Sequence, residues 1–149
     1  MIFVYIILAV VAVVIIKMVS GNMTTPKNLG VKDGRLAEMP KSPNAVSSQT
    51  DKEEYYVKPF PFKEDLEVSK AAILQSVEQY GGGEVVINEP NYIRILFTTA
   101  VMHYHDDMEF YFNEEAKIVE FRSASRIGYS DMGLNKERYN KLYKYYTNK

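Results

Sequence analysis

The chain has 149 residues, with 18 Lys and Arg against 19 Asp and Glu, which gives a net charge of −1. This length fits one globular domain beside a short apolar segment, and the balanced charge argues against nucleic acid as a partner, because phosphate binding requires a basic surface. The chain has no cysteine, which excludes disulfides, thiolate catalysis and Cys-ligated metal sites. Hydrophobic residues make up 46% of the chain, so a sizeable core can form.

The N-terminal segment, Met1–Val19, is apolar except for Lys17. As a helix it would span about 28 Å, close to the hydrocarbon thickness of a bilayer. We therefore predict a retained single-pass transmembrane anchor over residues 1–19. A cleaved signal peptide is the main alternative, but no Lys or Arg precedes the apolar run and no small-x-small site ends it. A buried core helix is a further alternative, although domains of this size rarely bury a helix that is apolar all round.

The segment after the anchor is expected to be a tether over residues 20–28, which are polar and contain Pro26. Residues 29–149 are expected to form a single α+β domain. Its first part, residues 29–62, has glycines and prolines without helical or strand periodicity, and we expect a mostly irregular segment that wraps the domain. Within it, residues 55–57 could form a short edge strand that Pro59 and Pro61 would end.

The remaining residues predict helices and strands in a simple order. A helix is expected over residues 64–80, ended by Gly81-Gly82-Gly83. Four strands follow at residues 84–89, 92–100, 107–112 and 117–125, and their meander order implies an antiparallel sheet. Asn135 is the predicted N-cap of a helix over residues 136–146, whose tyrosine stripe would pack on the sheet. The predicted fold is thus α+β: a transmembrane helix, a helix, a four-stranded antiparallel meander sheet and a C-terminal helix packed on it.

An acidic cluster supplies the candidate catalytic residues Asp106, Asp107 and Glu109. In a strand, Asp107 and Glu109 project to the same face, where two carboxylates could act as acid and base, bind a metal or pair with arginines. If residues 113–116 close the hairpin symmetrically, Asp107 lies opposite Arg122. Opposite charges across strands are a common structural device, so pairing is the favoured interpretation.

His103 and His105 are two residues apart, so in a strand their side chains would project to the same face. Pairs of metal ligands often have this spacing. The spacing of the sequence supplies no third ligand, so we predict no metal site and no cofactor.

The stretch from Ser123 to Asn135 leaves a strand, turns at two glycines and enters the last helix. Its hydroxyls, arginine and helix N-terminus could hold an anion. They could equally form turns and caps, with Arg126 paired to Asp106 or Asp131. The ligand-binding candidates are Arg122, Ser123, Ser125, Arg126, Ser130, Asp131, Asn135 and Arg138. The sequence has no Ser-His-Asp order, Walker loop or dinucleotide fingerprint.

Four motifs in this order resemble a known family. They are Asn28-Leu29-Gly30-Val31 with Gly34-Arg35-Leu36, Pro40-x-Ser42-Pro43-Asn44-x-Val46-Ser47-Ser48, Asp106-Asp107-x-Glu109-Phe110, and Arg122-Ser123-Ala124-Ser125-Arg126-x-Gly128-x-Ser130-Asp131-x-Gly133-x-Asn135 with Arg138. From about Asn28 to Tyr146 the chain resembles the bacterial and plastid domain of unknown function 1499 family. The resemblance implies an uncharacterised envelope- or membrane-associated domain, and it brings no activity, substrate or catalytic residue.

This chain departs from the family pattern at two positions. The pattern usually has a cysteine just before Pro40 and another just after Asn44, where this chain has Met39 and Ala45. The resemblance implies that the two cysteines act as a pair, as a disulfide would, and such a pair favours an extracytoplasmic domain. The four basic residues Lys17, Lys27, Lys32 and Arg35 instead favour the cytoplasmic side by the positive-inside rule.

Three functions follow from these observations. The favoured one is a non-catalytic module at the bacterial cell membrane that binds a partner or small anionic ligand. The alternative is a hydrolase that uses Asp106, Asp107 or Glu109 with Arg122 and Arg126, and it requires these five side chains to converge in a cleft. A purely structural envelope protein is the third, and it predicts no pocket.

Overall fold

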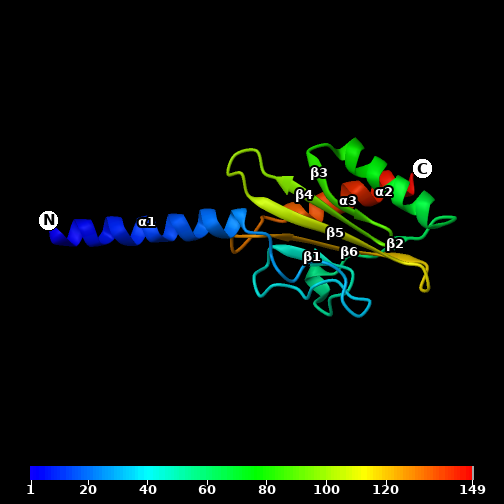
Figure 1. Ribbon diagram of the computed structural model, residues 1–149, viewed down its shortest axis with the longest axis horizontal. Helices are drawn as coiled ribbons and strands as arrows, with labels where there is room; N and C mark the ends of the chain where they lie inside the picture. Colours follow the sequence, from blue (N-terminus) through cyan, green and yellow to red (C-terminus); the bar gives the residue numbers. More distant parts are fainter. Residues whose placement is uncertain (149) are drawn as a thin grey trace.

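The computed structural model describes residues 1–148 and has an α+β fold from which one long helix projects (Figure 1). That helix, α1 (Ile2–Met23), is followed by β1 (Ala45–Ser47), the 3₁₀ turn η1 (Glu53–Tyr55), β2 (Phe60–Pro61) and α2 (Leu66–Tyr80). The strands β3 (Gly83–Glu89), β4 (Tyr92–Thr98), β5 (His105–Asn113) and β6 (Ile118–Ser125) come next, and α3 (Leu134–Thr147) ends the described chain. The predicted order is therefore confirmed for α1, α2, the four strands β3 to β6 and α3.

The sheet is larger than the sequence predicted. Within residues 1–148 it has six antiparallel strands, ordered β1-β6-β5-β4-β3, with β2 also paired to β6. The prediction of four strands was wrong because β1 and β2 are only three and two residues long, too short to show periodicity. Both add to the edge of β6, at different points along it. Residues 55–57 form no strand of their own: η1 ends at Tyr55, and Tyr56 makes a single bridge to Ser47.

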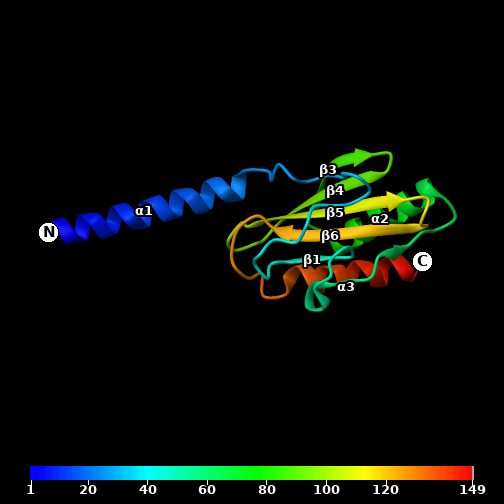
Figure 2. The same ribbon diagram turned by 90° about the horizontal axis from the view of Figure 1, so that it is seen from below.

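The two faces of the sheet are covered differently. Helices α2 and α3 pack on one face, here called the helical face, and enclose the apolar core (Figure 1). Phe60 from β2 lies fully buried in this core, in ring contact with Phe110, Phe121 and three tyrosines of α3. Irregular chain between α1 and η1 crosses the opposite face, here called the wrapped face (Figure 2).

The β5–β6 hairpin differs from the predicted register. Asn113 pairs with Ile118, so the loop is residues 114–117 rather than 113–116. Lys117 takes a left-handed conformation with φ 54°, and the Asn113 side chain accepts a hydrogen bond from Ala116 N at 2.9 Å. Moving the loop by one position moves every cross-strand pair by two. Arg122 therefore lies opposite Glu109, and Asp107 lies opposite Ala124.

The start of α3 also corrects a prediction. Gly133, not Asn135, is the N-cap, and Asn135 lies buried in the first turn. Asp131 takes the capping role, because its carboxylate accepts hydrogen bonds from Gly133 N at 3.1 Å and Asn135 N at 2.8 Å. Helix α2 has its cap at the N-cap position itself: the Asp65 side chain accepts a hydrogen bond from Val68 N at 2.8 Å, and its negative charge also suits the positive end of the helix dipole.

Helix α1 is long and apolar enough to cross a membrane. Its mean hydropathy is 3.0, and the chain around it buries none of this apolar stretch. An N-terminal signal sequence would share both properties, so the helix is a candidate membrane span. It continues through Met23, into the segment that the sequence had suggested to be a tether.

Candidate functional site

Strand alternation separates the three acidic candidates. Asp107 and Glu109 project to the wrapped face, as predicted, whereas Asp106 projects to the helical face beside Met108. All three carboxylates are buried, and each has an arginine partner. The five charged residues that a hydrolase would use therefore do not meet in one cleft.

On the wrapped face, Asp107 is held by two arginines. Arg126 donates from Nε to Oδ2 at 2.7 Å and from Nη2 to Oδ1 at 3.0 Å. This bidentate pairing fixes the guanidinium plane relative to the carboxylate plane. Arg94 Nη1 lies 3.7 Å from Oδ1. The expectation that Arg126 pairs with Asp106 or Asp131 was wrong, because Arg126 continues the alternation of β6 onto the wrapped face.

Glu109 is the most completely bonded of the acids. It is 0% exposed, and its Oε2 accepts a hydrogen bond from Arg122 Nη1 at 2.9 Å. Its Oε1 accepts from Tyr92 OH and from Gly30 N, both at 2.8 Å. Burial raises the pKa of the Tyr92 phenol, and the Glu109 charge raises it further, so Tyr92 acts as a donor and not as a base. The Gly30 bond pins the wrapping segment to the sheet.

On the helical face, a second polar group joins α3 to the sheet. Arg138 Nη1 donates to Asp106 Oδ2 at 3.2 Å and to Asn135 Oδ1 at 3.1 Å. Ser123 Oγ also donates to Asn135 Oδ1, and the Asn135 amide donates to Asn44 O and Ser125 Oγ. Burial raises the pKa of the Asp106 carboxyl despite its arginine partner. These candidates are brought together and bond mainly to one another, although Arg138 Nε has no hydrogen-bond partner among residues 1–148.

Ser130, which is exposed, and Asp131, which is half-buried, hold the loop before α3 in place. Ser130 Oγ accepts a hydrogen bond from Met132 N at 3.1 Å, and Asp131 caps the helix as described above. These contacts are the turn-and-cap chemistry that the sequence left as one of two alternatives. Within residues 1–148, no group of three or more His, Cys, Asp or Glu side chains is placed so that it could hold a metal ion.

A pocket of about 370 Å³ opens above the wrapped-face charges. Its floor is Asp107, Arg122 and Arg126, and its walls come from the wrapping segment. The full lining is Pro26, Asn28, Leu29, Glu38, Met39, Pro40, Asp107, Arg122, Ala124, Ser125 and Arg126. Larger hollows exist elsewhere, including one of about 480 Å³ around Arg35, but the pocket over Arg122 and Arg126 has buried guanidinium groups at its base.

Sequence reasoning missed the walls of this pocket. Leu29 and Met39 come from a segment without periodicity, and only the family resemblance drew attention to them. Met39, one of the two positions at which the resemblance described above implies a cysteine, lines the pocket.

The sequence model of one family, described as Protein of unknown function (DUF1499), matches residues 35–145. The chain belongs to this family. The match covers β1 to α3, and thus the sheet, both helices that pack on it and most of the pocket lining of this DUF1499 domain. No curated protein and no solved structure matches the chain.

Proposed function

We propose that this DUF1499 chain is a membrane-anchored, non-catalytic module that binds a small anionic ligand in the pocket over Arg122 and Arg126. The observation that carries the proposal is a charge count. In the described part of the chain, Arg94, Arg122 and Arg126 bring three guanidinium groups into the wrapped-face cluster, against the two carboxylates of Asp107 and Glu109. The cluster therefore holds one positive charge in excess.

Two of the three arginines of this cluster line the pocket. Arg122 and Arg126 are buried side chains at the base of the pocket, and Arg122 Nε has no hydrogen-bond partner among residues 1–148. Buried charges interact more strongly than exposed ones, because less water screens them. Glu38 adds an acid to the pocket wall, but it is exposed, and solvent weakens its opposition to an anion. A carboxylate or phosphate group fits this arrangement.

The pairing of the acids supports binding over catalysis. A general base must be free to take a proton, whereas Asp107 and Glu109 are each held by a guanidinium group. Asp106 lies on the other face of the sheet. The pocket in turn favours a binding module over a purely structural envelope protein.

The anchor rests on the length, hydropathy and exposure of α1. Lys27, Lys32 and Arg35 follow it, and by the positive-inside rule they favour a domain on the cytoplasmic side of a bacterial cell membrane. Protease treatment of intact cells tests the side: a cytoplasmic domain survives it, and loss of the domain would contradict this orientation. N-terminal sequencing of the membrane fraction tests retention, since a chain that begins near Gly21 would show cleavage.

Phosphate titration of the full chain in nanodiscs of zwitterionic lipid tests the ligand site. We expect phosphate to raise the melting temperature of the wild type and of Arg35→Gln, a control that loses the same charge from an exposed position of the wrapping segment. Arg122→Gln should lose this response. Acetate in place of phosphate separates a carboxylate site from a phosphate site, and nanodiscs with anionic lipid show whether a headgroup occupies the pocket.

Met39→Trp provides a second variant if Arg122→Gln folds poorly. The indole would fill the pocket without removing a charge, and the phosphate response should again disappear. The same phosphate response in wild type, Met39→Trp and Arg122→Gln would refute the site.

A further inference from the structure

The junction between α1 and the domain, here called the joint, is held by hydrogen bonds to Asn22. Asn22, in the last turn of α1, donates from Nδ2 to His103 O at 2.8 Å and accepts from His105 N at 2.8 Å through Oδ1. Its backbone oxygen accepts from Arg126 Nη1 at 3.2 Å and lies 3.0 Å from His105 Nδ1. Asn22 is buried, and Gly21 packs against Ile127. The direction of α1 relative to the sheet is thereby set by hydrogen bonds.

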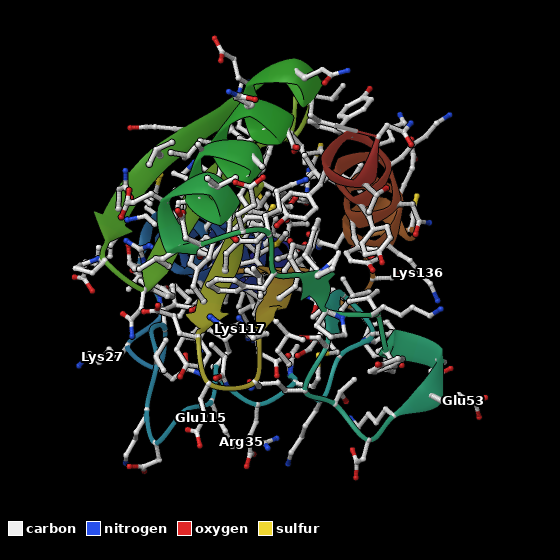
Figure 3. All side chains as sticks on the ribbon, turned by 90° about the vertical axis from the view of Figure 1, so that its right-hand side faces the viewer. Lys27, Arg35, Glu53, Glu115, Lys117 and Lys136 are labelled. Carbon is white, nitrogen blue, oxygen red and sulfur yellow. The ribbon has the colours of Figure 1, made fainter. Side chains whose placement is uncertain are left out.

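Two loops flank this joint. The β4–β5 loop (residues 99–104) and the β6–α3 loop (residues 126–133) both lie at the end of the domain from which α1 emerges, as Figures 1 and 2 show from two directions. The β5–β6 hairpin lies at the opposite end, which faces the viewer in Figure 3 with Glu115 and Lys117 near its turn. We call the two loops at the α1 end the rim loops.

The rim loops expose large apolar side chains. Val101 is 84% exposed and Met102 60% exposed, and in the second loop Tyr129 is 79% and Met132 98% exposed. No Lys, Arg, Asp or Glu occurs in residues 99–104. Clustered exposed apolar side chains mark a contact with a protein or a membrane, and tyrosine is enriched at the membrane–water interface.

The rim loops also lie level with the end of the apolar helix. A hollow of about 510 Å³ separates them from α1, and both sides line it: Ile15, Met18 and Val19 from the helix, and Met102, Tyr104 and Ile127 from the domain. Met102 thus shares a cavity with residues of the candidate span itself. If α1 crosses a bilayer, the rim loops must lie at the depth of its headgroups.

From this geometry we infer that the rim loops form a second contact with the bilayer, in which Val101, Met102, Tyr129 and Met132 enter the interfacial region around α1. The inference rests on the proposed anchoring by α1. Its occupant is a lipid surface: acyl chain ends and headgroups fill the hollow between Met18 and Met102. The domain is then held against the membrane in one orientation, and its β5–β6 hairpin points away.

Single-tryptophan variants test this contact, because the chain has no tryptophan of its own. The full chain is reconstituted in phosphatidylcholine vesicles that carry bromine either high or low on the acyl chain. Met102→Trp and Met132→Trp report on the rim loops. Glu115→Trp, at an exposed position of the far hairpin, is the matched control, and Val10→Trp reports on α1 itself.

We expect Val10→Trp to be quenched by deep bromines. Met102→Trp and Met132→Trp should be quenched by shallow bromines and respond several-fold less to aqueous acrylamide than Glu115→Trp does. If Val10→Trp is quenched by lipid while both rim reporters behave like Glu115→Trp, the rim contact is refuted and the anchor stands. If Val10→Trp is also unquenched, anchoring fails and the rim contact fails with it. Shielding of the rim reporters from acrylamide without lipid quenching would mean a protein occupant and would also refute the inference.

Discussion

The replacement of Glu109 by Gln tests whether the buried ion pairs hold the wrapped face together. The substitution keeps the shape of the side chain and an oxygen that can accept the bonds from Tyr92 and Gly30. It removes the negative charge that Arg122 contacts at 2.9 Å. Arg122 is left buried beside a neutral amide, in a cluster that already holds more guanidinium groups than carboxylates.

The expected cost is large because both side chains of the pair are buried. Removing one partner of a buried ion pair costs about 3–5 kcal/mol, since the remaining charge has lost its compensation. At about 4 °C per kcal/mol for a domain of this size, the melting temperature should fall by about 12–20 °C. Thermal unfolding of the full chain in detergent, followed by near-UV circular dichroism, measures the change. The tyrosines of the domain dominate that signal, so a helix α1 that persists in the micelle does not obscure it.

Glu137→Gln is the control, because it removes the same charge from an exposed pair with Lys141 on the surface of α3. Its melting temperature should stay at the wild-type value. The double variant Glu109→Gln with Arg122→Met removes both buried partners, and it should cost less than the two single variants added together. A drop of less than about 3 °C for Glu109→Gln would refute the reasoning, because it is less than the cost of one ordinary buried hydrogen bond.

Three further predictions concern the other parts of the fold. Phe60→Ala should destabilise the domain by about 3–5 kcal/mol in denaturant unfolding, since it empties the centre of the core. Gly83→Ala should cost about 1–3 kcal/mol in the same assay, because an added methyl would lie 2.8 Å from Ile95 and 2.9 Å from Val77. Burial raises the pKa of the Asp106 carboxyl, so the folded state binds the carboxyl proton more tightly than the unfolded state does. The stability that the protonated carboxyl contributes is therefore lost as pH rises through its folded pKa. Wild type should therefore lose stability relative to Asp106→Asn as pH rises from about 4 towards neutrality, and melts of both proteins across that range check the sign.

The longer elements of the fold could be predicted because their periodicity is a local property. The strands β4, β5 and β6 alternate apolar and polar side chains, and α2 has both a capping aspartate and a terminal glycine run. β1 and β2 carry no such signal. Each owes its conformation to pairing with β6, which is a tertiary contact between segments that lie far apart in the sequence.

The charged residues of the site were found, but their partners were not. Which carboxylate meets which arginine depends on the hairpin register, and the register depends on the left-handed conformation of Lys117, a residue type that rarely adopts it. Strand alternation correctly placed Asp107 and Glu109 on one face. It could not show that Arg138 would reach Asp106 from α3, because that contact depends on how the helix packs.

Arg126 connects the pocket with the joint to α1. Its Nε and Nη2 hold Asp107 at the base of the pocket, and its Nη1 donates to Asn22 O in the last turn of α1. A guanidinium group is planar and rigid, so these contacts cannot be adjusted independently. An anion that draws Arg126 towards the pocket would strain its bond to Asn22, and a change in the angle of α1 would displace the cation that lines the pocket. If an anion binds in the pocket and α1 spans a bilayer as proposed, this side chain would make ligand binding and the orientation of the domain energetically dependent on each other.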